Sequence, residues 1–332
     1  MTENAAVLGG GSWGTALSIA LADRGLDVLL YSNDPSVRDD VNQNHRNSRY
    51  LPEIDLPETV CSTVEIAEAA KRNVILLVVP SQVARLVLGQ LAEVGIQDDT
   101  LIISCTKGLD PKSGALMHEL IHEFFPNNPV AVLSGPSHAE EVARRMATLA
   151  TIGSEDPEVA ARAQEIFTLP WFRTYTSSDV IGIELGSVVK NVFAIAAGAA
   201  DGLGLGDNAK AALLTRGLAE MTRLGVALGG REETFRGLSG IGDLIVTCYS
   251  VHSRNNRFGR MLGSGKTLDE AVAEMNQVAE GVPNAKNAHD LSHRLNVRTP
   301  IIDQAYAVLY EQKPPGLALR ELLGRNPRSE HD

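Results

Sequence analysis

A glycine-rich turn close to the N-terminus has the spacing of a phosphate-binding loop. Gly9, Gly11 and Gly14 match the pattern G-x-G-x-x-G, between the apolar stretch Ala5–Leu8 and the helix-like stretch Thr15–Arg24. Glycines at these positions allow a tight turn, close approach of a pyrophosphate, and close packing of a helix on a strand. The free N–H groups at the start of the helix would attract the anion. Glycines also make ordinary turns, but the flanking strand and helix patterns favour dinucleotide binding.

Small polar residues and a lysine follow three further apolar stretches, in the segments Val78–Ser81, Thr106–Gly108 and Ser134–Ser137. If these stretches are parallel strands, their carboxyl ends border a ligand-binding cleft. Lys107 would meet an anionic or carbonyl oxygen there, although a loop lysine taken alone is more often simply solvated. The glycines and serines beside all three strand ends favour the cleft.

A second lysine, Lys190, lies within the apolar helical stretch Gly182–Ala200. Its neighbours three and four residues away are not acidic, so the helix itself offers no ion pair. Burial makes a lysine a candidate for proton transfer. The alternative is a lysine that extends its ammonium group to the surface, and local sequence leaves the two equal.

Three arginines, Arg254, Arg257 and Arg260, recur every three residues after a candidate helix start at Ser253. In a chain of net charge −11 such a cluster predicts an anion-binding face, and a solvated charged stripe is the alternative. Asp243, which follows a run of glycines, would orient a lysine, bind a substrate hydroxyl, or only stabilise a turn.

One motif points to different chemistry. His118, Glu119 and His122 match H-E-x-x-H, the zinc-binding pattern of metallopeptidases, and Glu140 or Glu141 has the spacing of a third ligand. The motif falls in the middle of a predicted crossover helix, away from the strand ends. We therefore interpret it as a chance match on a solvated helix face, and predict no metal site.

The elements that position these residues change character along the chain. Apolar runs alternate with helical stretches up to about residue 178, which predicts a doubly wound, Rossmann-like α/β domain over residues 1–178. The predicted strands beyond the first are Asp27–Tyr31, Asn73–Val79, Leu101–Cys105, Val130–Ser134, Leu149–Ile152 and Phe172–Tyr175. Residues 179–332 show helical patterns without a convincing strand, which predicts an all-α substrate-binding and catalytic domain.

Composition narrows the class of protein. The chain of 332 residues has 44% hydrophobic residues, no run of membrane-spanning length and no signal-peptide pattern, which favours a cytoplasmic protein. Its three cysteines (Cys61, Cys105 and Cys248) are too few and scattered for a disulfide scaffold. The acidic net charge argues against nucleic-acid binding.

Together these residues resemble the bacterial-type NAD(P)-dependent glycerol-3-phosphate dehydrogenase family. The resemblance runs from about residue 4 to about residue 325, through motifs in a fixed order. The motifs are Gly9–Gly14, Val79–Ser81, Thr106–Leu109, Ser134–Ser137, Val189–Val192, Leu214–Gly217, Gly240–Asp243, Ser253–Asn255 and Glu280–Gly281. It implies reversible hydride transfer between NAD(P)H and dihydroxyacetone phosphate, giving sn-glycerol 3-phosphate for phospholipid synthesis.

The resemblance also implies the role of individual residues. Lys190 would be the general acid/base, with Lys107 beside it at the substrate oxygen. The implied substrate contacts are Lys107, Gly135, Ser137, Lys190, Asp243, Ser253, Arg254 and Asn255. The implied cofactor contacts, beside the three motif glycines, are Ser12, Trp13, Asn33, Lys107, Ala139, Arg254, Val278 and Glu280.

The second predicted strand ends without the acidic residue that commonly binds the ribose of NAD. It ends at Ser32-Asn33, and Asp34 comes slightly late. Small polar residues leave room for a 2′-phosphate, with Arg38 as its partner, so we expect use of both NAD(H) and NADP(H) with NADPH preferred. A phosphorylated triose is the expected partner, with no nucleic acid and no membrane insertion. The oligomeric state stays open, with a homodimer as the candidate.

Three other functions remain to be separated from this one. A related two-domain dehydrogenase would prefer a hydroxy acid, and a redox sensor would bind NAD(P)H without turnover. A zinc peptidase is the remote case, through His118 and His122.

Overall fold

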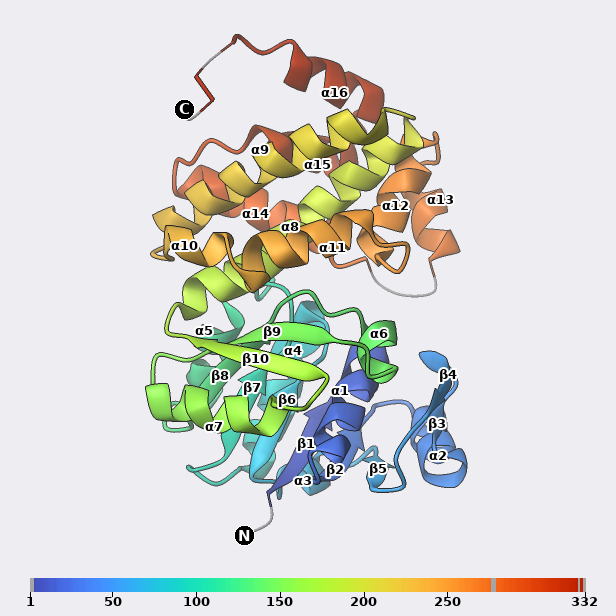
Figure 1. Ribbon diagram of the computed structural model, residues 1–332, viewed down its shortest axis with the longest axis vertical. Helices are drawn as coiled ribbons and strands as arrows, with labels where there is room; N and C mark the ends of the chain where they lie inside the picture. Colours follow the sequence, from blue (N-terminus) through green and yellow to red (C-terminus); the bar gives the residue numbers. More distant parts are fainter. Residues whose placement is uncertain (1–2, 276–278, 328, 331–332) are drawn as a thin grey trace. The chain divides into compact units, whose positions relative to one another are not determined.

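The computed structural model describes residues 3–275, 279–327 and 329–330 (Figure 1). The chain forms two compact units that are each discontinuous in sequence. The first contains Met1–Ser187 and Glu233–Asp243, and the second contains Val188–Glu232 and Leu244–Asp332. Three helices therefore contribute residues to both units: α8 (Val180–Gly202), α10 (Glu232–Phe235) and α11 (Asp243–Tyr249).

The first unit is built on one sheet of eight strands in the order β10-β9-β8-β7-β6-β1-β2-β5. Neighbouring strands pair in parallel, except that β8 and β9 are antiparallel. The strands are β1 Asn4–Leu8, β2 Asp27–Tyr31, β5 Val60–Thr63, β6 Val74–Leu77, β7 Leu101–Ser104, β8 Val130–Ser134, β9 Thr148–Gly153 and β10 Phe172–Ser177.

Helices cover both faces of this sheet (Figure 1). One face carries α1 (Ser12–Asp23), α6 (Ala139–Ala143) and α7 (Pro157–Phe167), and the other carries α3 (Ile66–Ala69), α4 (Ser81–Val94) and α5 (Met117–Phe124). Successive residues of β1 show the consequence, since Val7 packs on the first face and Leu8 on the second. Burial on both faces explains why the central strands β6, β7 and β8 are largely apolar. The predicted doubly wound sheet is confirmed.

Further segments complete the first unit. The helix α2 (Pro35–Asn44) leads into a small antiparallel pair, β3 (Arg46–Asn47) and β4 (Leu51–Asp55). A single π-helical turn, η1 (Leu238–Gly242), packs on β9. Its preceding helix is α10 (Glu232–Phe235).

The second unit is helical, and no strand follows β10 among the residues that the structure describes. The predicted all-α region is confirmed in its class. Beside parts of α8 and α11 it contains α9 Gly206–Ala227, α12 Arg254–Gly263, α13 Leu268–Glu274, α14 Gly281–Arg294, α15 Pro300–Tyr310 and α16 Pro315–Leu323.

Glycines allow the helices α8 and α12 to pack closely. A Cβ atom at Gly198 would lie 2.0 Å from the carbonyl oxygen of Asn256, and one at Gly259 would lie 2.0 Å from that of Ile195. Helix α8 is long and apolar enough to cross a membrane by length and composition, but 89% of its most apolar window is buried inside the protein. Burial of this kind is what the core helix of a folded domain shows.

Candidate functional site

The glycine turn joins β1 to α1, and two of its glycines are required by packing. Gly9 has a φ of +129°, and a Cβ there would lie 2.7 Å from the carbonyl oxygen of Val78. A Cβ at Gly14 would lie 1.9 Å from the carbonyl oxygen of Gly9. A Cβ at Gly11, in contrast, would have no atom of the described chain within 4 Å. Gly11 therefore opens onto space at the N-terminus of α1, where backbone N–H groups favour a bound phosphate.

Two predicted cofactor contacts lie beside this turn. Trp13 is partly buried against the core, and its buried indole N–H has no hydrogen-bond partner among the described residues. Asn33 is exposed just beyond β2. The following Asp34 accepts hydrogen bonds from the N–H and hydroxyl of Ser36, at 2.9 and 2.7 Å, and is ion-paired with Arg49. These contacts lower the pKa of Asp34, first through Ser36 and then through Arg49. The carboxylate is therefore already used as the cap of α2.

The carboxyl ends of β6, β7 and β8 lie side by side in the sheet, as predicted for the three polar segments. The hydroxyl of Thr106 donates to the carbonyl oxygen of Val79 at 2.8 Å, which joins the loops after β6 and β7. Lys107 Nζ donates to Asp243 Oδ2 at 3.1 Å and to the carbonyl oxygen of Gly135 at 3.4 Å. The Lys107 side chain is 19% exposed and that of Asp243 is 1% exposed. Lys107 is thus held in place by a buried carboxylate, and the interpretation as an ordinary solvated lysine is wrong.

The loop after β8 is also tightly constrained. Gly135 has a φ of +151°, and a Cβ there would lie 2.9 Å from the Cα of Ala150. The Ser137 hydroxyl donates to the carbonyl oxygen of Gly135 at 3.0 Å, and Ala139 begins α6. The first unit therefore brings together eleven predicted site residues at or near this edge of its sheet or in η1 and its end. They are Gly9, Gly11, Ser12, Trp13, Gly14, Asn33, Lys107, Gly135, Ser137, Ala139 and Asp243.

The second unit holds Lys190, on α8. Its side chain is buried, with 4% of the residue exposed, and Nζ donates to the hydroxyl of Thr247 at 3.0 Å. Thr247 lies on α11, 57 residues further along the chain. The interpretation of Lys190 as a lysine that reaches the surface is therefore wrong. Sequence reasoning did not single out Thr247, because only the packing of α11 on α8 brings it to the lysine.

The segment around Arg254 is positioned by hydrogen bonds of its neighbours. The Ser253 hydroxyl accepts the N–H of Asn256 at 3.2 Å and so caps the start of α12. Asn255 donates from Nδ2 to Asn191 Oδ1 at 2.9 Å, and its Oδ1 accepts the N–H of Gly281 at 2.9 Å. These bonds join α12 to α8 and to α14. Arg254 lies between Ser253 and Asn255 at the first position of α12 and is partly exposed.

The other predicted members of this cluster differ in their placement. Glu280 immediately precedes α14, whereas Val278 lies outside the described residues. Arg260 is ion-paired with Asp201 at 3.0 Å, and Arg257 is exposed near Met275. Arg260 is thus engaged by a carboxylate far away in sequence, and an anion-binding face made of the three arginines stays a prediction.

The H-E-x-x-H motif lies on α5 in a different setting from the one predicted. His118 Nδ1 is 2.5 Å from Glu184 Oε2, and Glu184 Oε1 accepts a hydrogen bond from the backbone N–H of His118 at 3.1 Å. The two side chains are 14% and 6% exposed, so this part of α5 is not a solvated face and that prediction is wrong. Burial opposes the charged form of His118, but the contact with the Glu184 carboxylate outweighs it, and the pKa of His118 is raised. The pair fastens α5 to the start of α8, and His122 is exposed.

Comparisons with known proteins agree over nearly the whole chain. Residues 4–160 match the model of the NAD-dependent glycerol-3-phosphate dehydrogenase N-terminus, and residues 179–320 match that of its C-terminus. A glycerol-3-phosphate dehydrogenase [NAD(P)+] of Bacillus cereus is 47% identical over 96% of this chain and 95% of its own length. One of Clostridium botulinum is 45% identical, over 97% and 98%. The crystal structure of glycerol-3-phosphate dehydrogenase from Coxiella burnetii is similar with a TM-score of 0.94 and 40% identity, covering 98% of this chain and 99% of that one.

Proposed function

Because the chain belongs to the NAD-dependent glycerol-3-phosphate dehydrogenase family, we infer that it reversibly transfers a hydride between NAD(P)H and dihydroxyacetone phosphate, giving sn-glycerol 3-phosphate. It is an oxidoreductase with a small-molecule substrate. Relatives that carry this activity share 45–47% of its residues over nearly their full length, so neither a hydroxy-acid dehydrogenase nor a non-catalytic sensor is favoured. We propose that its product serves phospholipid synthesis.

We propose Lys190 as the general acid/base of the reaction. Reduction of a ketone needs a proton at the carbonyl oxygen as the hydride reaches carbon, and the ammonium group of a lysine supplies one. The observation that carries this assignment is the burial of Lys190 with its Nζ fixed on the Thr247 hydroxyl at 3.0 Å. An ordered Nζ needs less reorganisation to deliver its proton than one on a solvated side chain.

Lys107 is proposed as the group that polarises the substrate carbonyl. Its ammonium is anchored by Asp243 and by the carbonyl oxygen of Gly135, at the carboxyl end of β7. This edge of an α/β sheet is where ligands bind. Asp243 acts on the substrate through Lys107 by fixing the position of Nζ, which is the orienting role that its sequence context suggested.

The residues around the glycine turn fit a dinucleotide. A Cβ at Gly11 would meet no described residue within 4 Å, which supports close approach of a pyrophosphate to the backbone there. When bound, NAD(P)H supplies the hydride. We propose that the turn from Gly9 to Gly14 holds its phosphates, with Asn33 near the adenosine ribose and Glu280 as a further contact.

Arg254 is proposed to bind the phosphate of the substrate, with Ser253 and Asn255 beside it. The planar guanidinium group forms paired hydrogen bonds to phosphate oxygens. Hydrogen bonds of Ser253 and Asn255 order the start of α12 and join it to α8 and α14, so the backbone that carries Arg254 is held in place. Gly135 and Ser137 complete the proposed set of substrate contacts.

We further propose residues 1–178 as the dinucleotide-binding domain and residues 179–332 as the substrate-binding and catalytic domain. The matched family regions, 4–160 and 179–320, support a division at this place. The two compact units differ from it in that residues 179–187 and 233–243 belong to the first unit. A cytoplasmic location without membrane insertion or nucleic-acid binding agrees with the acidic charge and the burial of α8. A homodimer is the proposed assembly.

The test is the oxidation of NADPH by purified protein, followed by absorbance, with dihydroxyacetone phosphate as substrate. We expect turnover that depends on this substrate and disappears when the phosphate is omitted, as with dihydroxyacetone. Turnover of a 2-oxo acid in preference to the phosphorylated ketone would instead indicate a hydroxy-acid dehydrogenase. Binding of NADPH without turnover of any carbonyl compound would indicate a sensor.

A further inference from the structure

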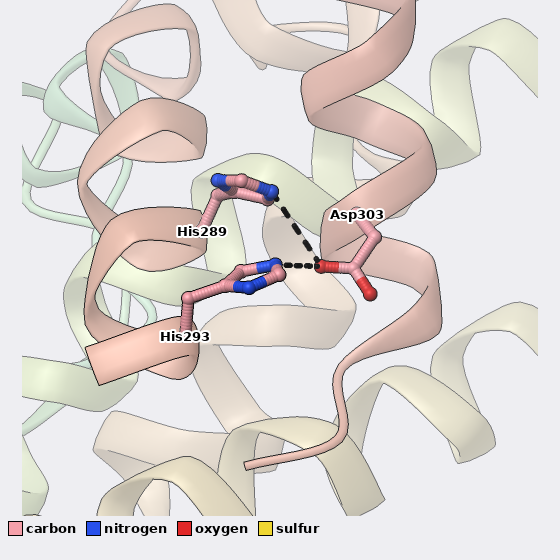
Figure 2. Close-up of side chains that lie close together, drawn as sticks. All are labelled: His289, His293 and Asp303. Carbon is pink, nitrogen blue, oxygen red and sulfur yellow. Dashed lines mark ion pairs between the residues drawn. The ribbon is translucent and has the colours of Figure 1, made fainter. Parts of the chain in front are cut away.

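Two histidines and an aspartate of the second unit converge at a place that the proposed reaction does not use. His289 and His293 lie one turn apart on α14, and Asp303 faces them from α15 (Figure 2). Asp303 Oδ1 is 3.5 Å from His293 Nε2 and 3.9 Å from His289 Nε2. One ligand atom from each residue lies within 4.8 Å of the others.

The aspartate oxygen at the centre of this cluster is buried but unsatisfied. Asp303 Oδ1 has no hydrogen-bond partner in the part of the chain that the structure describes, although both imidazoles point toward it (Figure 2). A buried carboxylate oxygen that accepts no hydrogen bond is costly, unless a cation satisfies it. His293 Nε2 at 3.5 Å and His289 Nε2 at 3.9 Å form ion pairs with this oxygen if the imidazoles are protonated, but neither donates a hydrogen bond to it.

The His289 ring is held in an orientation that suits a metal ligand. It stacks on Tyr306 with ring centroids 4.0 Å apart and an interplanar angle of 9°. Its Nδ1 lies 3.5 Å from Asp290 Oδ1, and the other carboxylate oxygen of Asp290 accepts a hydrogen bond from Lys286 at 2.8 Å. Nδ1 forms no hydrogen bond in the part of the chain that the structure describes, so Asp290 acts on this imidazole through its charge. A carboxylate near the distal nitrogen of a histidine is common behind metal-binding imidazoles. Nε2, the nitrogen nearer to Asp303, is then the free donor atom.

From these contacts we propose a binding site for one divalent cation of the zinc class, with His289 Nε2, His293 Nε2 and Asp303 Oδ1 as ligands. Two ligands of a tetrahedral zinc, each at about 2.0–2.1 Å, lie about 3.3 Å apart. The separation from Asp303 Oδ1 is 3.5 Å for His293 Nε2 and 3.9 Å for His289 Nε2, so His289 would have to move closer to bind the ion. Two imidazoles and one carboxylate are donors that zinc accepts. His293 is 64% exposed, so the ion has access from solvent and room for a water as its fourth ligand. The ion would join α14 to α15.

The full-length protein, treated with EDTA and then dialysed, tests this site by calorimetric titration with Zn²⁺ alone. We expect one zinc per chain, and a higher melting temperature in its presence. His293→Gln and Asp303→Asn should each weaken binding by more than about 100-fold, because they remove direct ligands, and Asp290→Asn by about 10-fold. His293 is on the surface, so its substitution leaves the fold intact, which circular dichroism checks.

His122→Gln is the matched control. His118 and His122 have the same four-residue spacing on α5, but belong to the H-E-x-x-H motif. We expect this variant to bind zinc like the parent protein. No stoichiometric binding by the parent would overturn the proposal and leave the cluster as a set of ion pairs. Binding lost in His122→Gln but kept in His293→Gln would overturn it too, by placing the ion on α5.

Discussion

At the scale of single residues, Lys190 is the position where the proposed chemistry is most directly tested. Lys190→Ala removes the proposed proton donor, so we expect kcat to fall by roughly 10²–10⁴ while NADPH binding is retained. The measurement is steady-state reduction of dihydroxyacetone phosphate, together with NADPH binding by fluorescence. Lys112→Ala, which removes an exposed lysine from a loop of the first unit, is the control and should leave both unchanged. A near-normal kcat in Lys190→Ala would show that the role is assigned to the wrong residue.

Arg254 is predicted to act on binding rather than on the chemical step. Arg254→Lys keeps the charge but loses the planar pair of donors, so we expect KM for dihydroxyacetone phosphate to rise by roughly tenfold with a smaller change in kcat. Steady-state kinetics at saturating NADPH measures both. Arg257→Lys, on the exposed side of α12, is the matched control. Equal KM values for Arg254→Lys and the parent would exclude a phosphate contact at this residue.

Residue types and spacing predicted which side chains are candidates, but not what they touch. Three of these contacts are distant in sequence. Lys107 contacts a carboxylate 136 residues away, Lys190 a hydroxyl 57 residues away, and His118 a carboxylate 66 residues away. No local pattern encodes such contacts, which is why the solvated alternatives for these residues were reasonable and wrong. Asp303 escaped notice for the same reason, because α15 must first pack on α14.

At the scale of elements, the glycine turn contains one glycine that the packing of the fold requires, Gly14, and one that only the bound ligand would require, Gly11. Gly14→Ala places a Cβ against the carbonyl oxygen of Gly9, so we expect loss of close packing between α1 and β1 and a clearly lower melting temperature. Gly11→Ala meets no atom of the described chain, so the fold should keep its melting temperature.

Binding of NADPH gives the second half of this test. Gly11→Ala should weaken it by at least about tenfold, or 1.4 kcal/mol, because the added methyl group occupies the space left for the pyrophosphate. Thermal denaturation and NADPH titration of the two variants make the comparison. Unchanged affinity in Gly11→Ala would mean that the dinucleotide does not approach the turn.

The helices α9 and α15 are joined by a buried carboxylate that predicts a pH dependence of stability. Glu220 accepts the N–H of Ile301 at 2.8 and 3.0 Å and that of Ile302 at 3.2 Å, at the start of α15. Burial nevertheless raises the pKa of Glu220 from 4.5 to about 7. The folded state then holds this proton more tightly than the unfolded chain. The free energy of unfolding therefore falls as pH rises from 4.5 to about 7, by on the order of 3 kcal/mol, and Glu220 contributes no further change above that.

Glu220→Gln isolates this contribution, since it cannot titrate. Urea denaturation at a series of pH values should show the parent losing stability relative to the variant between pH 4.5 and 7. A constant difference between the two proteins over this range would mean that Glu220 has an unperturbed pKa. A difference that grows in the opposite direction would mean that hydrogen bonds from the two N–H groups, which lower the pKa of Glu220, outweigh the effect of burial.

Elements with strong apolar patterns were predicted closely, and weakly patterned ones were missed. The predicted strands Asp27–Tyr31 and Val130–Ser134 have the bounds of β2 and β8. The hairpin of β3 and β4, the edge strand β5 and the helix α2 escaped prediction. They are short or partly exposed, so their residues lack the continuous apolar run that marks a strand buried on both faces.

At the scale of the whole molecule, a net charge of −11 disfavours binding of the substrate and of both dinucleotides, because all of them are anions. Local cations must therefore decide between NADPH and NADH. Beyond β2, Asn33 is exposed and Asp34 is already engaged by Ser36 and Arg49, so no free carboxylate at that position repels a 2′-phosphate. Arg38 lies on α2, the helix that Asp34 caps, and is ion-paired with Asp39 at 2.7 Å. The region is thus suited to the more negative cofactor.

We therefore expect kcat/KM to be higher with NADPH than with NADH, while both support turnover. Arg38→Ala and Arg49→Ala should each lower the value for NADPH by roughly tenfold, since a hydrogen bond to a charged group contributes about 1.5 kcal/mol, and leave that for NADH nearly unchanged. Arg46→Ala is the matched control, because this arginine lies on β3, in the same hairpin as Arg49, and like the other two is ion-paired, with Asp55 at 2.6 Å. If all three variants changed the NADPH to NADH ratio equally, the general field of the molecule would set the preference. A change confined to Arg38 or Arg49 would locate the 2′-phosphate beside α2.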